Sequence, residues 1–333
     1  MSVAVAESSL GATLGISSSK ERRERGPPIG FVQLLQQFHT ITSLTLGSSA
    51  VQKVMNSYVT RVAWEQPYLM HMVLAVACTH HRRLVPTGFA SGMEREFALV
   101  EATHWQAGLK LYQAELRKAA ETRTLDGDAL IGTTFLSVIY LFALSETNGP
   151  DSYIMEYNEA ITRVQAPMMA GSGIPALQSA LGILESTIVW RSVIDSANDS
   201  QGTFSSRAKG TNGLPPALVL LCDIRQDSSA DTNEYHTILR QLSPLFGLGS
   251  GPANFVKLAA FGGRTARHFR PLLARKDEKA LLLLSYWFAL LQQVDQWWCL
   301  ERARSEYLAI TNYLAAKGSG RVLALLHHPG FTA

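Results

Sequence analysis

Cysteine and long hydrophobic runs are both scarce in this sequence. The three cysteines among 333 residues, Cys78, Cys222 and Cys299, are too widely spaced for a disulfide framework or a CxxC zinc site. The two longest apolar stretches, 130–144 and 281–291, are shorter than the roughly 20 residues that a membrane helix needs. We therefore expect a soluble protein of a reducing compartment, with no membrane span, in the cytoplasm, the nucleus or both.

Charged residues are also few. Lysine and arginine total 30 and the acidic residues 27, so the formal net charge is only +3. This balance argues against a protein that coats nucleic acid with a basic surface. Hydrophobic residues make up 47% of the chain, which is enough to bury a sizeable core. Composition thus predicts a folded globular protein, without saying what the protein does.

The common catalytic motifs are missing as well. The sequence has no HExxH, GxSxG or GxxxxGK[ST] motif. Its two pairs of adjacent histidines would point about 100° apart on a helix, so neither pair suits one metal ion. A class I terpene cyclase would need an aspartate-rich magnesium site, and Asp195 with Asn198 and Asp199 lacks the companion carboxylates. We expect no metal and no cofactor.

A helical period is present almost everywhere from Phe31 onward. Phe31, Leu34, Leu35 and Phe38 recur at i, i+3, i+4 and i+7, the apolar stripe of a helix. No segment alternates long enough to be a strand, so we predict an all-α fold, an irregular bundle of about ten to twelve helices. Further helices are expected at 48–64, 67–84, 92–121, 126–144, 151–168, 175–197, 231–245, 253–270, 277–293, 295–316 and 319–327.

Two segments interrupt this pattern. Residues 1–30 are rich in small and serine residues and end in a charged cluster, 20–25, and we expect a disordered leader. A flexible tail and a basic targeting or phosphate-contacting segment are both open interpretations of it. Residues 31–333 are expected to form a single all-α domain. Within that domain the polar stretch 197–214 predicts a flexible loop, either a lid or a plain connection.

Two groups of residues stand out for function. In the first, Pro67 begins a helix whose first part, up to Ala77, is strongly apolar and carries one histidine, His71. In the second, a very apolar helix containing Tyr286 is followed by Asp295 and a tryptophan pair. His71 is either a buried, hydrogen-bonded histidine or a partner for a ligand hydroxyl or a proton. Asp295 is either the N-cap of the last long helix or an acid catalyst.

These residues resemble the C-terminal effector domain of fungal zinc-cluster transcription factors of the sterol uptake control protein type. The similarity extends from residue 31 to about residue 330 and rests on packing motifs, which specify a fold better than an activity. The matching positions are Leu34, Leu35, Phe38 and Thr40; Pro67 to Ala77; Tyr286, Trp287, Asp295, Trp297 and Trp298; and Leu326 to Pro329.

The resemblance implies an effector-like domain that senses a hydrophobic small molecule, with sterols or terpenoids as the ligand class. Family members carry a six-cysteine zinc cluster before this domain, whereas no cysteine precedes Cys78 here. We therefore expect no specific nucleic-acid binding by this chain itself. The large residues on its most apolar helices are candidate ligand contacts, although each is also explained by core packing. These candidates are Met70, His71, Phe135, Tyr140, Tyr286, Trp287 and Phe288.

Three functions stay open. The first is a transcription-regulator-like protein of secondary metabolism that acts through a DNA-binding regulator or a second copy of itself. The second is a cofactor-independent enzyme of a terpenoid pathway, a pericyclase that orients its substrate for a cyclisation or a Diels–Alder-type cycloaddition. The third is a simple binding or carrier protein. For all three we expect a cavity between the helices at 67–84, 126–144 and 277–293.

Overall fold

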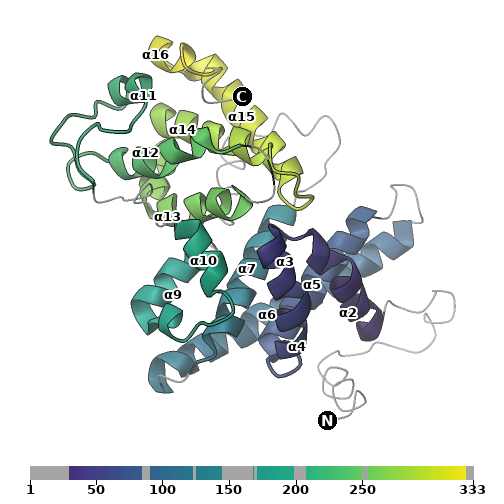
Figure 1. Ribbon diagram of the computed structural model, residues 1–333. Helices are drawn as coiled ribbons and strands as arrows, with labels where there is room; N and C mark the ends of the chain where they lie inside the picture. The colour runs from purple at the N-terminus through teal and green to yellow at the C-terminus, as the bar shows by residue number, and fades with distance from the viewer. Residues whose placement is uncertain are drawn as a thin grey trace.

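The computed structural model describes residues 30–84, 91–122, 125–144, 168, 171–198, 208–249, 251 and 254–327. Within these residues the chain forms ten helices of seven or more residues and no strand, which confirms the all-α prediction (Figure 1). The elements in chain order are α2 (Phe31–Thr40), η2 (Thr42–Thr45), α3 (Ser49–Lys53), η3 (Val54–Val59), α4 (Thr60–Val62), α5 (Pro67–Leu84), α6 (Ser91–Thr122), α7 (Gly127–Ala143), α9 (Gly173–Leu181), η5 (Ile183–Glu185), α10 (Arg191–Asn198), α11 (Pro216–Leu221), α12 (His236–Leu242), η6 (Ser243–Gly247), α13 (Phe255–Ala274), α14 (Glu278–Leu291), α15 (Leu300–Lys317) and α16 (Gly320–Leu323).

Helix α5 is the centre of the N-terminal group of helices, which consists of α2 to α10. It packs against α2, α6 and α7, so every residue from Tyr68 to His80 except His71 is buried. Gly108 of α6 allows the close approach of α5, because a Cβ there would lie 3.1 Å from the Met72 methyl group. A helix enclosed on several sides needs apolar residues around most of its circumference, which explains the composition of this segment.

Helix α14 is the central helix of the C-terminal group, which consists of α11 to α16. Its N-cap is Asp277, whose carboxylate accepts a hydrogen bond from the Ala280 backbone N–H at 2.9 Å. All residues from Ala280 to Leu291 are buried against α12, α13, α15 and α16. The two most apolar segments of the sequence are therefore the central helices of two neighbouring groups.

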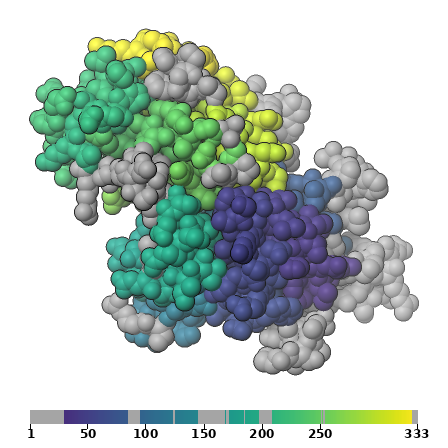
Figure 2. Space-filling model, viewed as in Figure 1, coloured from purple at the N-terminus to yellow at the C-terminus, as the bar shows by residue number. Residues whose placement is uncertain are grey.

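The two groups meet where α13 lies against α9 and α10 (Figures 1 and 2). The buried apolar side chains form one continuous cluster that runs through both groups, from Leu34 to Leu326. Two arginines join the groups at the C-terminal end of α7, where backbone carbonyls lack helical partners. Arg83 of α5 donates to the Ala143 carbonyl at 2.7 Å and also to the Glu301 carboxylate of α15 at 2.6 Å. Arg302 of α15 donates to the Leu144 carbonyl at 2.6 Å.

The single helix expected over 175–197 is wrong. Gly182 adopts a left-handed conformation, with φ of +63°, and ends α9, so the segment forms α9, the short turn η5 and α10. The predicted start at 295 is also wrong, because α15 begins at Leu300. Helix α11 was not predicted; Pro216 supplies its first residue, where a missing N–H costs nothing.

Several expectations fall partly or wholly outside the described residues. These are the disordered leader up to residue 29, the helix at 151–168 except Met168, and positions 199–207 of the expected flexible loop. The end of that loop is held in place, since Arg240 of α12 donates to the carbonyls of Lys209 and Gly210 at 2.9 and 2.8 Å. No helix among the described residues has the length and apolar character needed to cross a membrane.

Candidate ligand-binding pocket

The first turn of α7 positions one wall of a pocket. Asp126 caps the helix, accepting a hydrogen bond from the Ala129 N–H at 2.9 Å. Asp128, two residues further and buried, has a different role. Its carboxylate accepts hydrogen bonds from the Thr187 hydroxyl at 3.0 Å and from the backbone N–H groups of Ile188, Val189 and Trp190 at 3.1–3.2 Å. Asp128 thereby fixes the segment that leads into α10.

This anchor orients Trp190. The indole N–H of Trp190 donates to the Asp128 backbone carbonyl at 3.0 Å, and the side chain is almost fully buried. The indole ring lies 5.4 Å from the ring of Phe135 on α7, tilted by 31°. Phe135 in turn meets Phe255 of α13 edge-on, at 6.3 Å between ring centroids. Three aromatic rings from separate segments thus form a rigid side of the pocket.

Beyond Phe255, helix α13 also approaches the start of α9 very closely. A Cβ at Gly263 would lie only 2.2 Å from the Gly171 carbonyl oxygen, so only glycine allows the two backbones to meet. A Cβ at Gly262 would lie 2.9 Å from the Trp287 ring. This contact fixes the position of the next residue, Arg264, at the pocket.

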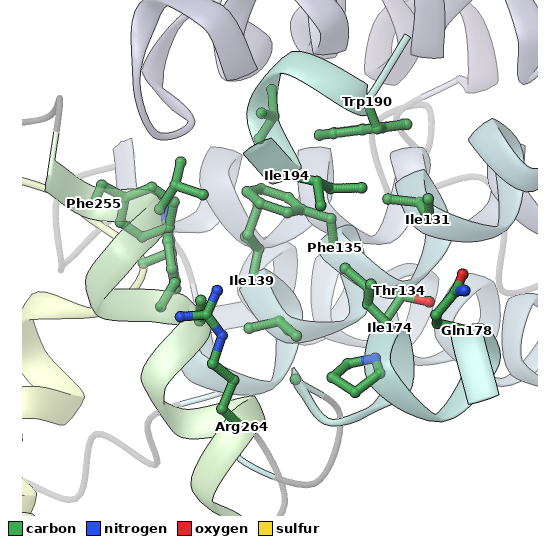
Figure 3. Close-up of a pocket in the computed structure, with 18 residues that line it drawn as sticks. Ile131, Thr134, Phe135, Ile139, Ile174, Gln178, Trp190, Ile194, Phe255 and Arg264 are labelled. Atoms are coloured by element: carbon green, nitrogen blue, oxygen red, sulfur yellow. The ribbon is translucent and has the colours of Figure 1, made fainter. Parts of the chain in front are cut away.

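Helices α7, α9, α10 and α13, with Trp298 beyond α14, line a partly open cavity of about 340 Å³ (Figure 3). Apolar side chains provide nearly all of its lining, including Ile131, Ile139 and Ile194. A concave, mainly apolar cavity of this size with few polar groups is typical of small-molecule sites.

Among the described residues, three polar side chains contribute to the lining: Thr134, Gln178 and Arg264. The Thr134 hydroxyl donates to the Leu130 carbonyl at 2.9 Å and lies 2.8 Å from the Tyr112 hydroxyl. Burial lowers the pKa of the Arg264 guanidinium from its ordinary value, although an arginine stays charged at physiological pH. The pocket thus combines an apolar body with one positive charge.

Of the residues expected to bind a ligand, Phe135 lines this pocket. Met70 and Phe288 are buried on the central helices α5 and α14. The Tyr140 ring stacks on Trp105 at 4.1 Å, away from the cavity lining.

Two further candidates serve the packing of the C-terminal group. The Tyr286 hydroxyl donates to the Leu325 carbonyl at 2.5 Å, and the Trp287 indole N–H donates to the Leu258 carbonyl at 2.8 Å. Neither side chain lines the pocket. Of the three helices expected to enclose a cavity, only α7 contributes to this one.

The two candidate catalytic residues also lie outside the pocket. His71 faces α6, where its Nδ1 is 2.9 Å from the Nδ1 of His104, and burial lowers the pKa of both rings, that of His104 to about 4. Asp295 is exposed in the turn between α14 and α15. The expectation that it caps the last long helix is wrong, because the N-cap position is occupied by Cys299.

Sequence reasoning missed most of the pocket, and Arg264 above all. One signal was present: Val256, Ala260 and Arg264 recur at intervals of four residues, the spacing of one helical face. All three line the pocket. Trp190 gave no such signal, since its position depends on a carboxylate 62 residues earlier in the chain.

The described residues contain no group of three or more histidine, cysteine, aspartate or glutamate side chains that could hold a metal ion. No protein-family model matches the chain, and no curated protein matches it.

Proposed function

We propose that the protein binds an apolar small molecule of the terpenoid type in the pocket between α7, α9, α10 and α13. One observation carries the proposal: a cavity of about 340 Å³ whose lining, in the part of the chain that the structure describes, is apolar apart from Thr134, Gln178 and Arg264. A concave, mainly apolar lining with a few polar groups is typical of sites that take an apolar small molecule.

The volume favours the smaller members of the expected ligand class. A dry apolar cavity of about 150 Å³ accepts benzene. In proportion, the cavity of about 340 Å³ suits a skeleton of roughly 14 non-hydrogen atoms. This matches a small terpenoid, whereas a sterol skeleton would extend beyond the described cavity.

A regulator-like role in secondary metabolism is the first form of the proposal, and it rests on the resemblance to ligand-sensing effector domains. In that role the ligand would change how the domain binds a DNA-binding regulator or a second copy of itself. The alternative is an orienting enzyme. The rigid rings of Phe135, Trp190 and Phe255 favour this enzyme role, because they would restrict a flexible ligand to few conformations.

The test is native mass spectrometry of the protein expressed in its own host, compared with the variant Ala260→Phe. Ala260 lines the pocket, so a phenyl ring there should exclude the ligand. Ala274→Phe, on an exposed position of the same helix, is the matched control and should retain the ligand. We expect a lipophilic molecule on the wild-type protein and on the control, but not on Ala260→Phe.

Two outcomes would change the conclusion. A molecule that stays bound to Ala260→Phe would place the site elsewhere and contradict the proposal. A recovered molecule that the purified protein converts into a second compound would identify the alternative, the orienting enzyme.

A further inference from the structure

We infer that Trp190 is the floor of the pocket and determines how large a ligand the pocket can bury. This inference rests on the proposed binding function and names the residue that limits the size of the ligand. It depends on three features of Trp190: its place in the pocket, the hydrogen bonds that fix it, and the residues behind its ring.

Trp190 closes one side of the pocket. Its side chain lines the cavity, yet the residue is only 1% exposed. Arg264 also lines the cavity and is half-buried, and Figure 3 shows the two side chains on opposite sides of the pocket. Solvent does not reach the pocket past the indole ring, so Trp190 is the floor and the more exposed side is the mouth.

The floor is fixed at both ends of the residue. The Trp190 backbone N–H donates to the Asp128 carboxylate at 3.2 Å, and the indole N–H donates to the Asp128 carbonyl at 3.0 Å. A ligand that pushed the ring aside would break the buried indole hydrogen bond and separate the ring from Phe135. Methionine at this place would adapt to ligands of several sizes, whereas an anchored indole does not.

The residues behind the ring are apolar. The edge of the indole lies over Gly132 of α7, where an added Cβ would be 3.7 Å from the Trp190 ring. The same point lies 3.6 Å from side-chain carbons of Leu69 and Val59, which are both fully buried. A smaller side chain at position 190 would therefore deepen the pocket into an apolar region instead of opening it to water.

A rigid floor predicts a limit in ligand size. Each CH₂ group that enters the pocket should strengthen binding about fourfold, until the chain reaches the indole ring. Further groups stay in water at the mouth and add little. The cavity of about 340 Å³ holds roughly 14 non-hydrogen atoms. Phenylalanine has roughly three side-chain atoms fewer than tryptophan and alanine roughly nine fewer, so these variants should hold roughly 17 and roughly 23 atoms.

The test measures the affinity of a series of 1-alkanols, from 1-octanol to 1-hexadecanol, by displacement of a fluorescent apolar dye. For the wild-type protein we expect the affinity to rise about fourfold per CH₂ group up to about 13 carbons and then to level off. This measurement needs no variant, so it does not depend on whether a variant folds.

Variants then assign the limit to Trp190. In Trp190→Phe the affinity should rise up to about 16 carbons, and in Trp190→Ala it should rise through the whole series. Trp105→Phe is the matched control: this tryptophan stacks on Tyr140 outside the cavity lining, so the limit should stay at about 13 carbons. Circular dichroism shows whether each variant folds, and Trp190→Phe, which keeps an aromatic ring, tests the assignment without Trp190→Ala.

The outcomes separate the two claims. A limit that stays at the same chain length in Trp190→Phe, with binding retained, would overturn the role of Trp190 and leave the binding function standing. An affinity that rises through 1-hexadecanol in the wild-type protein would also overturn it, because no floor would then limit the ligand. Binding of no alkanol to the folded wild-type protein would count against the proposed function itself.

Discussion

Replacing Asp128 by asparagine tests the anchor that holds the pocket wall. One carboxylate oxygen, Oδ1, accepts hydrogen bonds from Thr187, Val189 and Trp190, and the other, Oδ2, accepts from Ile188 and Val189. An asparagine can keep the first set through its carbonyl oxygen. Its NH₂ group would then face the Ile188 N–H, donor against donor.

The expected cost follows from this count. The Val189 N–H keeps its bond to the first oxygen, whereas the Ile188 N–H loses its charge-assisted hydrogen bond, which is worth roughly 1.5–3 kcal/mol. The Ile188 side chain is 83% exposed, so water can reach its N–H and replace part of the lost bond. We expect Asp128→Asn to lower the free energy of unfolding by about 2 kcal/mol.

The control is Asp126→Asn, two residues earlier in the same helix start. Asp126 makes an N-cap bond, and asparagine caps a helix as well as aspartate does, so this variant should change stability by less than about 0.5 kcal/mol. Urea unfolding followed by tryptophan fluorescence measures both, and the midpoint of Asp128→Asn should fall with an unchanged slope. An unchanged midpoint for Asp128→Asn, or an equal loss in Asp126→Asn, would refute the assigned role of the anchor.

Two further predictions concern packing and pH. Gly263→Ala should destabilise the fold by roughly 1–3 kcal/mol in the same assay, because the new methyl group meets the rigid Gly171 backbone. Gly320→Ala is the control: open space surrounds this position, so the variant should be neutral or stabilising. Equal urea midpoints for the two variants would contradict the close contact at Gly263. The fold holds His104 neutral, with its pKa lowered to about 4 by burial and by His71, while the unfolded chain takes up the proton near pH 6.5. Stability should therefore be complete above pH 6.5 and fall by roughly 1 kcal/mol per pH unit below about pH 6. Urea midpoints from pH 7.5 down to about pH 4.5 would show this fall, and His104→Gln should make it shallower; a midpoint that does not depend on pH would contradict it.

Local signals predicted the central helices accurately. The expected helices at 67–84, 126–144 and 277–293 match α5, α7 and α14 closely. Each begins at a residue that acts within one turn of its own helix: Pro67 begins α5, Asp126 caps α7 and Asp277 caps α14. The burial of α5 and α14 was visible in the sequence because both are apolar around most of their circumference. Leu74, on α5, is fully buried, as its position predicts.

The errors occur where distant residues decide the local structure. The turn before α15 is fixed by Gln296, whose side-chain oxygen accepts hydrogen bonds from the Gly47 backbone N–H at 2.6 Å and from the Trp298 indole at 3.2 Å. Neither contact is visible in the sequence around Asp295, which reads as an ordinary cap before a helix. Helical periodicity alone could not show that the helix begins five residues later, at Leu300.

The residues of the candidate site were harder to predict than the helices, because their surroundings also depend on distant parts of the chain. Large apolar residues on a buried helix line a cavity or fill a core according to what faces them, and the sequence does not show what faces them. Phe135 lines the pocket, whereas Trp287, which is equally apolar, packs in the core over Gly262. The more informative residue was Arg264, because a charge on an otherwise apolar helical face has to be solvated, paired or bound. Helix α13 carries other cations, including Arg270, and only the approach of α9 and α10 separates the arginine at the pocket from the one in solvent. A charge that interrupts an apolar stripe is therefore a better guide to a site in such a helical protein than the aromatic residues around it.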